Sequence, residues 1–91
     1  MKTIDKIRGK FSNNEYEFTI PHFFEEMADD GLEFSDIEKI IDTGNIRRKF
    51  TDDPRGTRYE IVGSCNDERE VAIICRIKGT GKLLLITVYA L

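Results

Sequence analysis

The hydrophobic residues follow a helical period in the first half of the chain. Three segments carry apolar residues three or four positions apart, and this spacing predicts amphipathic helices over residues 3–11, 21–30 and 35–43. In the second of these we expect an inward-facing stripe made of Phe23, Phe24 and Met27. The third carries Ser35 and Glu38 at the spacing of a capping box, which marks a helix start.

After Gly44 the period changes from helical to alternating, and the short connections are rich in turn-forming residues. This pattern predicts four strands, which cover residues 45–52, 57–65, 69–77 and 83–91. Short connections favour an antiparallel meander. The last two strands are apolar at nearly every position and belong at the centre, whereas the basic residues of the first suit an edge strand. A further short extended segment is expected where Tyr16, Phe18 and Ile20 alternate.

The order of elements predicts an α+β fold in which N-terminal helices pack on a C-terminal antiparallel four-stranded sheet. All 91 residues fit one domain, and 40% hydrophobic with 34% charged residues is a globular composition. No apolar run approaches the roughly 20 residues that span a bilayer. The charged N-terminus lacks the apolar stretch of an export signal, so we expect a cytoplasmic protein. Two cysteines are too few for a disulfide framework or a metal site, so neither a metal nor another cofactor is expected.

Charge is distributed unevenly along the chain, although its net value is only −3. Residues 13–43 are strongly acidic, with Lys39 as their single basic residue. From Gly44 onward, basic residues outnumber acidic ones. Such asymmetry can steer a polyanion toward one face of a protein, although a mixed solvated surface also explains it.

His22 is the only histidine, and it lies at the start of the second predicted helix. Helical spacing places it on the side shared with Glu25 and Glu26, away from the apolar stripe. An imidazole there is either a general acid or base or a surface and capping group without chemistry.

Three side chains of the predicted strands are candidates for chemistry. Arg58 shares a strand face with Glu60, and Arg76 interrupts an otherwise apolar strand. A charge in such a strand needs a partner, so either Glu60 or Glu70 forms a salt bridge with it, or both arginines hold a phosphate. Tyr89 either donates a hydrogen bond to an oxyanion, stacks on a base, or packs at the edge of the core.

The order of these signals is similar to that of a known family. A histidine opens a helix, a second helix ends in "TGNI", and then follow "DDPRGTRYEIVG" and the terminal "LLLITVYAL". In these features residues 15–91 resemble the DUF4258 family, whose fold is similar to the RelE and BrnT toxins of bacterial toxin–antitoxin pairs. The helix within residues 1–14 is an addition to this pattern.

The resemblance implies a metal-free ribonuclease, an mRNA interferase that holds RNA against its sheet. By position it implies that His22 is the base or acid, that Arg58 and Arg76 neutralise the phosphate, and that Tyr89 assists. It also matches Thr87 to a Thr-x-Tyr pattern near the C-terminus, which we assign to RNA binding. An antitoxin protein and RNA are the implied partners.

Two acidic residues depart from the family pattern. The family usually has arginines four and eight residues after the histidine, where this chain has Glu26 and Asp30. Carboxylates there repel phosphate, which favours two alternatives to a nuclease. One is a non-catalytic protein-interaction module with the same fold. The other is a non-cleaving RNA binder that uses three adjacent basic residues, Arg47, Arg48 and Lys49.

Overall fold

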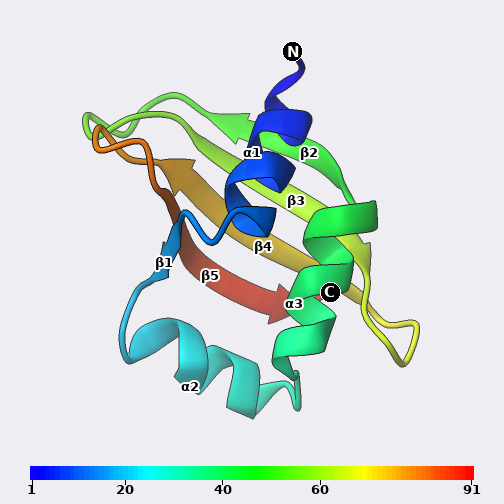
Figure 1. Cartoon of the computed structure of the whole chain (residues 1–91). Helices are drawn as coiled ribbons and strands as arrows, with labels where there is room; N and C mark the ends of the chain where they lie inside the picture. Colours follow the sequence, from blue (N-terminus) through cyan, green and yellow to red (C-terminus); the bar gives the residue numbers. More distant parts are fainter.

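The computed structural model describes all residues from 1 to 91 and contains three helices and five strands (Figure 1). In chain order these are α1 (Thr3–Ser12), β1 (Tyr16–Phe18), α2 (His22–Asp29), α3 (Phe34–Thr43), β2 (Asn45–Phe50), β3 (Arg58–Ser64), β4 (Glu70–Ile77) and β5 (Leu83–Ala90). The three predicted helices and four predicted strands are all present, which confirms the α+β class. None of the helices has the length and apolar character that crossing a membrane requires.

The five strands form one sheet in the order β1-β5-β4-β3-β2. The predicted antiparallel meander is confirmed for β2 to β5, with β4 in the centre and basic β2 at one edge. The prediction of a four-stranded, purely antiparallel sheet is wrong, because β1 adds a fifth strand parallel to β5. Its three residues pair with a strand more than sixty residues further along the chain. Local periodicity carries no information about such a distant partner.

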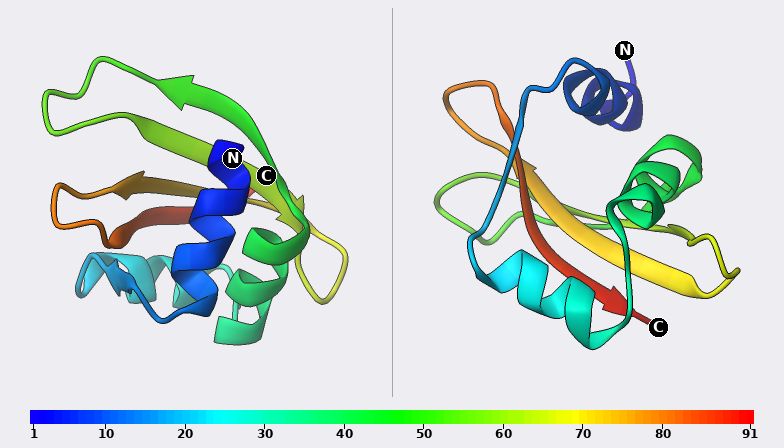
Figure 2. Two further views of the ribbon diagram at one scale, coloured as in Figure 1. Left: turned by 45° about the horizontal axis from the view of Figure 1, so that its top comes forward. Right: turned by 60° about the horizontal axis from the view of Figure 1, so that its bottom comes forward.

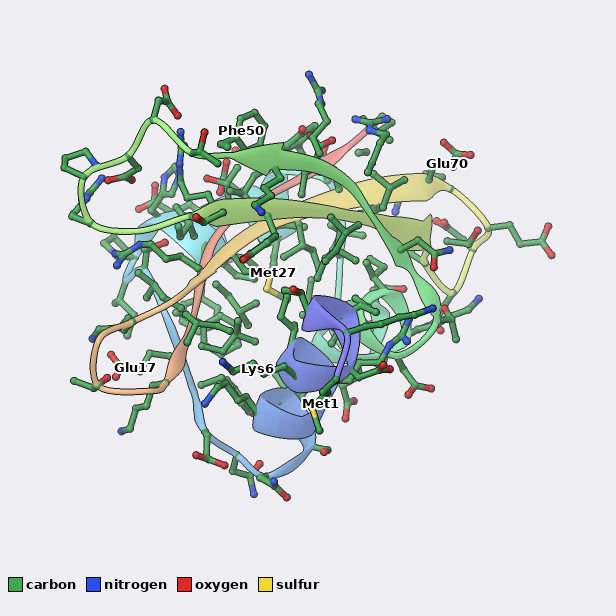
Figure 3. All side chains as sticks on the ribbon, turned by 90° about the horizontal axis from the view of Figure 1, so that it is seen from above. Met1, Lys6, Glu17, Met27, Phe50 and Glu70 are labelled. Atoms are coloured by element: carbon green, nitrogen blue, oxygen red, sulfur yellow. The ribbon has the colours of Figure 1, made fainter.

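The helices leave one face of the sheet uncovered. Helices α1 and α3 lie together over the other face, and α2 runs along the free edge of β5 (Figure 2). A buried apolar cluster lies between the helices and the sheet, and its members include Ile7, Phe23, Ile37, Ile40, Ile61, Ile73 and Leu85. We call α1 and α3 the helical layer. We call the uncovered side the open face; Figure 3 shows Phe50 on it, with α1 on the opposite side of the sheet.

The apolar stripe of α2 is narrower than predicted. Phe23 and Met27 are buried in the core, but 44% of Phe24 is exposed, so its assignment to the inward stripe is wrong. A helical residue lies about 100° around the axis from its neighbour, and only one of two consecutive phenylalanines can point straight inward. The ring of Phe24 packs instead against Phe18 of β1, with the ring centroids 5.0 Å apart.

The start of α3 is capped by a different pair from the one predicted. Glu33 is the N-cap residue, and its backbone N–H donates to the carboxylate of Asp36 at 2.8 Å. The second oxygen of Asp36 accepts from the backbone N–H of Asn66 at 2.7 Å, which ties α3 to the β3–β4 turn. Ser35 lies inside the first turn, and its Oγ accepts from Asn66. The capping box predicted from Ser35 and Glu38 is therefore shifted by two residues.

Candidate functional site

A buried carboxylate organises the centre of the open face. Glu60 of β3 is only 1% exposed, and it accepts hydrogen bonds from Arg47 Nε at 2.8 Å and Arg48 Nε at 3.1 Å. The hydroxyl of Tyr89 also donates to it. A bulge in β2 at Arg47 allows two consecutive arginines to reach the same carboxylate. The hydrogen bond from Arg47 is the largest cause that lowers the pKa of Glu60, from 4.5 to about 2, against the opposing effect of burial.

Tyr89 is held by this network. Its hydrogen bond to Glu60, followed by burial, raises the pKa of the phenol. Tyr89 lies on the open face and is not among the side chains that pack against the buried apolar cluster. Thr87 lies two residues earlier on the same face of β5, opposite Ile74 of β4.

Arg58 lies at the start of β3, further along the open face. Its guanidinium is 3.5 Å from a carboxylate oxygen of Asp52 and 3.6 Å from one of Asp53, and it lies over the ring of Phe50 at 5.2 Å. Arg58 therefore forms its ion pairs with the β2–β3 loop. The contact with Asp53 is made by the Nε atom of Arg58, which is buried and lies just beyond hydrogen-bond distance of the carboxylate.

Arg76 has no carboxylate partner. It lies directly opposite Arg58 in the β3–β4 register, and its only side-chain hydrogen bond goes from Nη1 to the backbone oxygen of Arg55 at 3.3 Å. Neither Glu60 nor Glu70 forms an ion pair with it. Its Nε atom, like that of Arg58, is buried without a partner. Arg58 and Arg76 therefore lie opposite each other on the open face, and no carboxylate offsets the charge of Arg76.

The structure does not bring His22 to these arginines. The imidazole is 57% exposed, and its Nε2 is 3.2 Å from Glu26 Oε1 one turn further along α2. Strands β4 and β5 lie between Arg58 and α2, because β3 and β5 are two interstrand spacings apart, about 10 Å. His22 and Arg58 therefore do not face one phosphate, which the mechanism implied by the resemblance requires.

Glu26 and Asp30 bind the backbone at the free edge of β5. Beyond the short strand β1, the N–H groups of Val88 and Ala90 have no neighbouring strand. Glu26 Oε1 accepts from Val88 at 3.2 Å, and Asp30 Oδ2 accepts from Ala90 at 3.0 Å. The two departures from the family pattern therefore have a structural function, which the sequence does not reveal because the edge is formed by distant residues.

The three adjacent basic residues of β2 do not form one surface. Arg47 and Arg48 reach Glu60 on the open face, whereas Lys49 pairs with Tyr59 and points to the side of the helical layer. Of the four residues assigned to RNA binding, Arg47, Arg48 and Thr87 therefore share the open face. The sequence did not identify Glu60 as the common hydrogen-bond acceptor of Arg47 and Arg48. The only signal for this role is an acidic residue in the strand that follows two consecutive arginines.

The remaining chemistry-bearing side chains are dispersed. Burial raises the pKa of the Cys75 thiol to about 12, which removes its thiolate at neutral pH. Nowhere in the chain do three side chains of the metal-ligating types come together.

The fold and the open face define a small α+β domain that presents arginines on the sheet face opposite its helical layer. Residues 20–90 match the family model described as "Domain of unknown function (DUF4258)", and the chain belongs to that family. The matched region begins after α1 and β1. No curated protein and no solved structure matches this chain.

Proposed function

We propose that this DUF4258 domain binds RNA on its open face, with Arg58 and Arg76 holding a backbone phosphate. The observation that carries this proposal is that Arg58 and Arg76 lie opposite each other in the β3–β4 register, with no carboxylate partner for Arg76. Arg76 donates only to the backbone oxygen of Arg55, so no ion pair offsets its positive charge. A phosphate bound by the two arginines would offset this charge.

The register of the sheet adds a second argument. Cross-strand neighbours such as Arg58 and Arg76 have Cβ atoms about 5 Å apart, and like charges at this position repel each other. Asp52 and Asp53 offset the charge of Arg58 only, since no carboxylate lies within 4.0 Å of Arg76. A phosphodiester offers two oxygens, and the planar guanidinium group matches its geometry better than an ammonium group does.

The resemblance to RelE-like toxins supports RNA as the source of the phosphate, since those proteins hold RNA against the sheet. In this proposal the open face, which no helix covers, takes the place of that surface. Four arginines lie on this face, and Glu60, Asp52 and Asp53 offset part of their charge. Binding of this kind does not require His22, which lies beyond two further strands.

The proposal is tested by fluorescence anisotropy with a labelled single-stranded RNA of mixed sequence, over a series of salt concentrations. Arg76→Ala removes one charge-assisted contact and is expected to weaken binding about tenfold or more. It should also reduce the slope of log K against log salt by about 0.7, the value for one phosphate contact on a single strand. Arg76→Lys keeps the charge but lacks the planar pair of donors of the guanidinium group. Its affinity for the RNA should therefore lie between those of the wild type and Arg76→Ala.

Lys6→Ala is the matched control, because it removes one positive charge from the exposed side of α1. It should leave the affinity nearly unchanged. Equal weakening by Lys6→Ala and Arg76→Ala would mean that the RNA responds only to overall charge. That result, or no binding at low salt, would refute the proposal.

A second candidate is the metal-free ribonuclease toxin with an antitoxin partner, and the network around Glu60 favours it. A carboxylate, a phenol and two guanidinium groups meet there on the proposed RNA face. The low pKa of Glu60 makes it a weak base, so cleavage would depend on Tyr89 and the arginines. A cleaving toxin predicts growth arrest on expression that Tyr89→Phe relieves. A binding module predicts normal growth and intact RNA.

A further inference from the structure

We propose that a cleft on the helical side of the molecule binds a lysine side chain of a partner protein. The cleft has a volume of about 380 Å³ and lies where the end of α1, strand β1 and helix α3 meet. Its principal lining residues are Phe11, Asn14, Tyr16, Phe34, Glu38 and Asp42. This cleft lies on the opposite side of the sheet from the open face. Binding in the cleft is therefore a function separate from the proposed RNA binding.

Three aromatic rings from three different elements form the wall of the cleft. The rings of Phe11 and Tyr16 stack with centroids 4.5 Å apart, and Phe34 lies 5.9 Å from Phe11. Phe34 remains 39% exposed although it is a large apolar side chain. Aromatic faces attract cations through their quadrupole, and they also accept the aliphatic stem of a lysine.

The acidic residues of the cleft lie in line with one of these rings. Phe34, Glu38 and Asp42 follow each other at intervals of four residues, so they form one stripe along α3. Both carboxylates are exposed, and neither forms an ion pair. The one basic side chain of α3, Lys39, donates instead to the backbone oxygen of Cys65 at 3.1 Å.

The position of Asp42 is unfavourable for the helix itself. Asp42 lies in the last turn of α3, which contains no basic residue, and a carboxylate there opposes the helix dipole. Arg8 of α1 binds the carbonyl oxygens of Ile41 and Gly44, so it stabilises the backbone end of the helix. It makes no ion pair with Asp42. A cation bound in the cleft would offset both negative side chains.

The charge and the size of the cleft together select the occupant. Two unpaired carboxylates exclude an anion, and they make a purely apolar ligand a poorer match than a cation with an apolar stem. The volume is near the lower end of the range for ligand sites, roughly 300–1,000 Å³, which suits one long side chain. A lysine of a partner protein combines an ammonium group for the carboxylates with four methylenes for the rings.

The experiment titrates the full chain with three capped tripeptides and follows the backbone amide shifts by NMR. The peptides are alanine–X–alanine, with X being lysine, norleucine or glutamate, which differ in charge while keeping a linear side chain. We expect the lysine peptide to shift the amides of Phe11, Asn14, Phe34 and Glu38. The norleucine peptide should bind about fivefold more weakly or worse, because it lacks the ammonium group. The glutamate peptide should not bind.

The double substitution Glu38→Gln with Asp42→Asn should weaken the lysine peptide about twofold to tenfold and leave the norleucine peptide unchanged. Glu25→Gln with Asp29→Asn is the matched control, because it removes two exposed carboxylates of α2 and should change neither affinity. Equal binding of the lysine and norleucine peptides would overturn the proposal, as would shifts outside the cleft or no shifts at all.

Discussion

Glu60 brings together side chains that the sequence presents as independent binding groups. Strand alternation correctly places Arg58 and Glu60 on one face, because a strand fixes which side each residue takes; that Arg76 shares this face follows only from the β3–β4 register. It does not identify the partner of Glu60. That choice depends on the bulge in β2, where Arg47 and Arg48 both turn toward the same carboxylate. The sequence therefore predicts the position of the candidate groups but not their pairing.

Replacing Glu60 by Gln should destabilise the fold. Hydrogen bonds between ionised partners contribute about 1.5–3 kcal/mol each, and the neutral amide cannot satisfy two guanidinium groups and a phenol. We expect the free energy of unfolding to fall by roughly 2 kcal/mol at neutral pH, measured by urea denaturation. Glu70→Gln makes the same chemical change at an exposed position of β4 and should have little effect.

The same carboxylate should make stability depend on pH. The folded pKa of Glu60 is lowered from 4.5 to about 2, so its contribution is complete above 4.5 and is lost as the pH falls toward 2. At 1.36 kcal/mol per pKa unit, this lowering corresponds to roughly 3 kcal/mol. Between neutral pH and about pH 3, the wild type should therefore lose more stability than Glu60→Gln does. Parallel losses in the two proteins would show that Glu60 is not the group that titrates.

At the scale of elements, α2 protects the edge of β5 that the short strand β1 leaves unpaired. Thr19 binds the backbone oxygen of Ile86, and Glu26 and Asp30 accept the next two outward N–H groups. Periodicity predicted α2 itself, since a helix is a local structure. It could not predict this docking, because the edge of β5 is more than fifty residues away. For the same reason, the sequence predicts the extended segment at β1 but not its pairing with β5.

Substituting Glu26 by Arg, the residue usual in the family, should expose the edge of β5 locally. The N–H of Val88 then loses its acceptor, which costs about 1–3 kcal/mol if the amide stays buried. We expect faster hydrogen exchange at Val88, measured by NMR, with little change at Thr87, whose N–H faces β4. Glu25→Arg places the same charge on the exposed side of α2 and serves as the control. Unchanged exchange at Val88 in Glu26→Arg would contradict the structural function of this residue.

The junction between α3 and β2 depends on close backbone contact at Gly44. A Cβ at this position would lie 2.5 Å from the backbone oxygen of Ile40 and 2.7 Å from that of Val62. Backbone atoms cannot move aside cheaply, so Gly44→Ala should lower the free energy of unfolding by about 1–3 kcal/mol. Gly79→Ala, where the added methyl meets nothing within 4 Å, should be nearly neutral. Equal midpoints of thermal unfolding for both variants would show that the junction tolerates a side chain.

At the scale of the whole molecule, the uneven charge of the sequence becomes a difference between two surfaces. The open face carries the arginines of β2, β3 and β4, whereas the acidic side chains of α3 line a cleft on the other side of the sheet. The two surfaces lie on opposite sides of the sheet, the sides of Phe50 and of α1 in Figure 3. The arginines favour an anionic ligand on the first, and the acidic residues favour a cationic ligand on the second. Net charge alone, at −3, gives no hint of either.

The most direct test of RNA binding by the open face is an NMR titration of the full chain with a short single-stranded RNA. We predict that the amides of β3, β4 and the β2–β3 loop around Arg58 and Arg76 shift, and that Arg76→Ala removes most of these shifts. The amides of α1 and α3 should stay in place. Shifts centred on α2 around His22 would contradict this account and restore the histidine as the centre of the site, and no shifts at low salt would contradict RNA binding altogether.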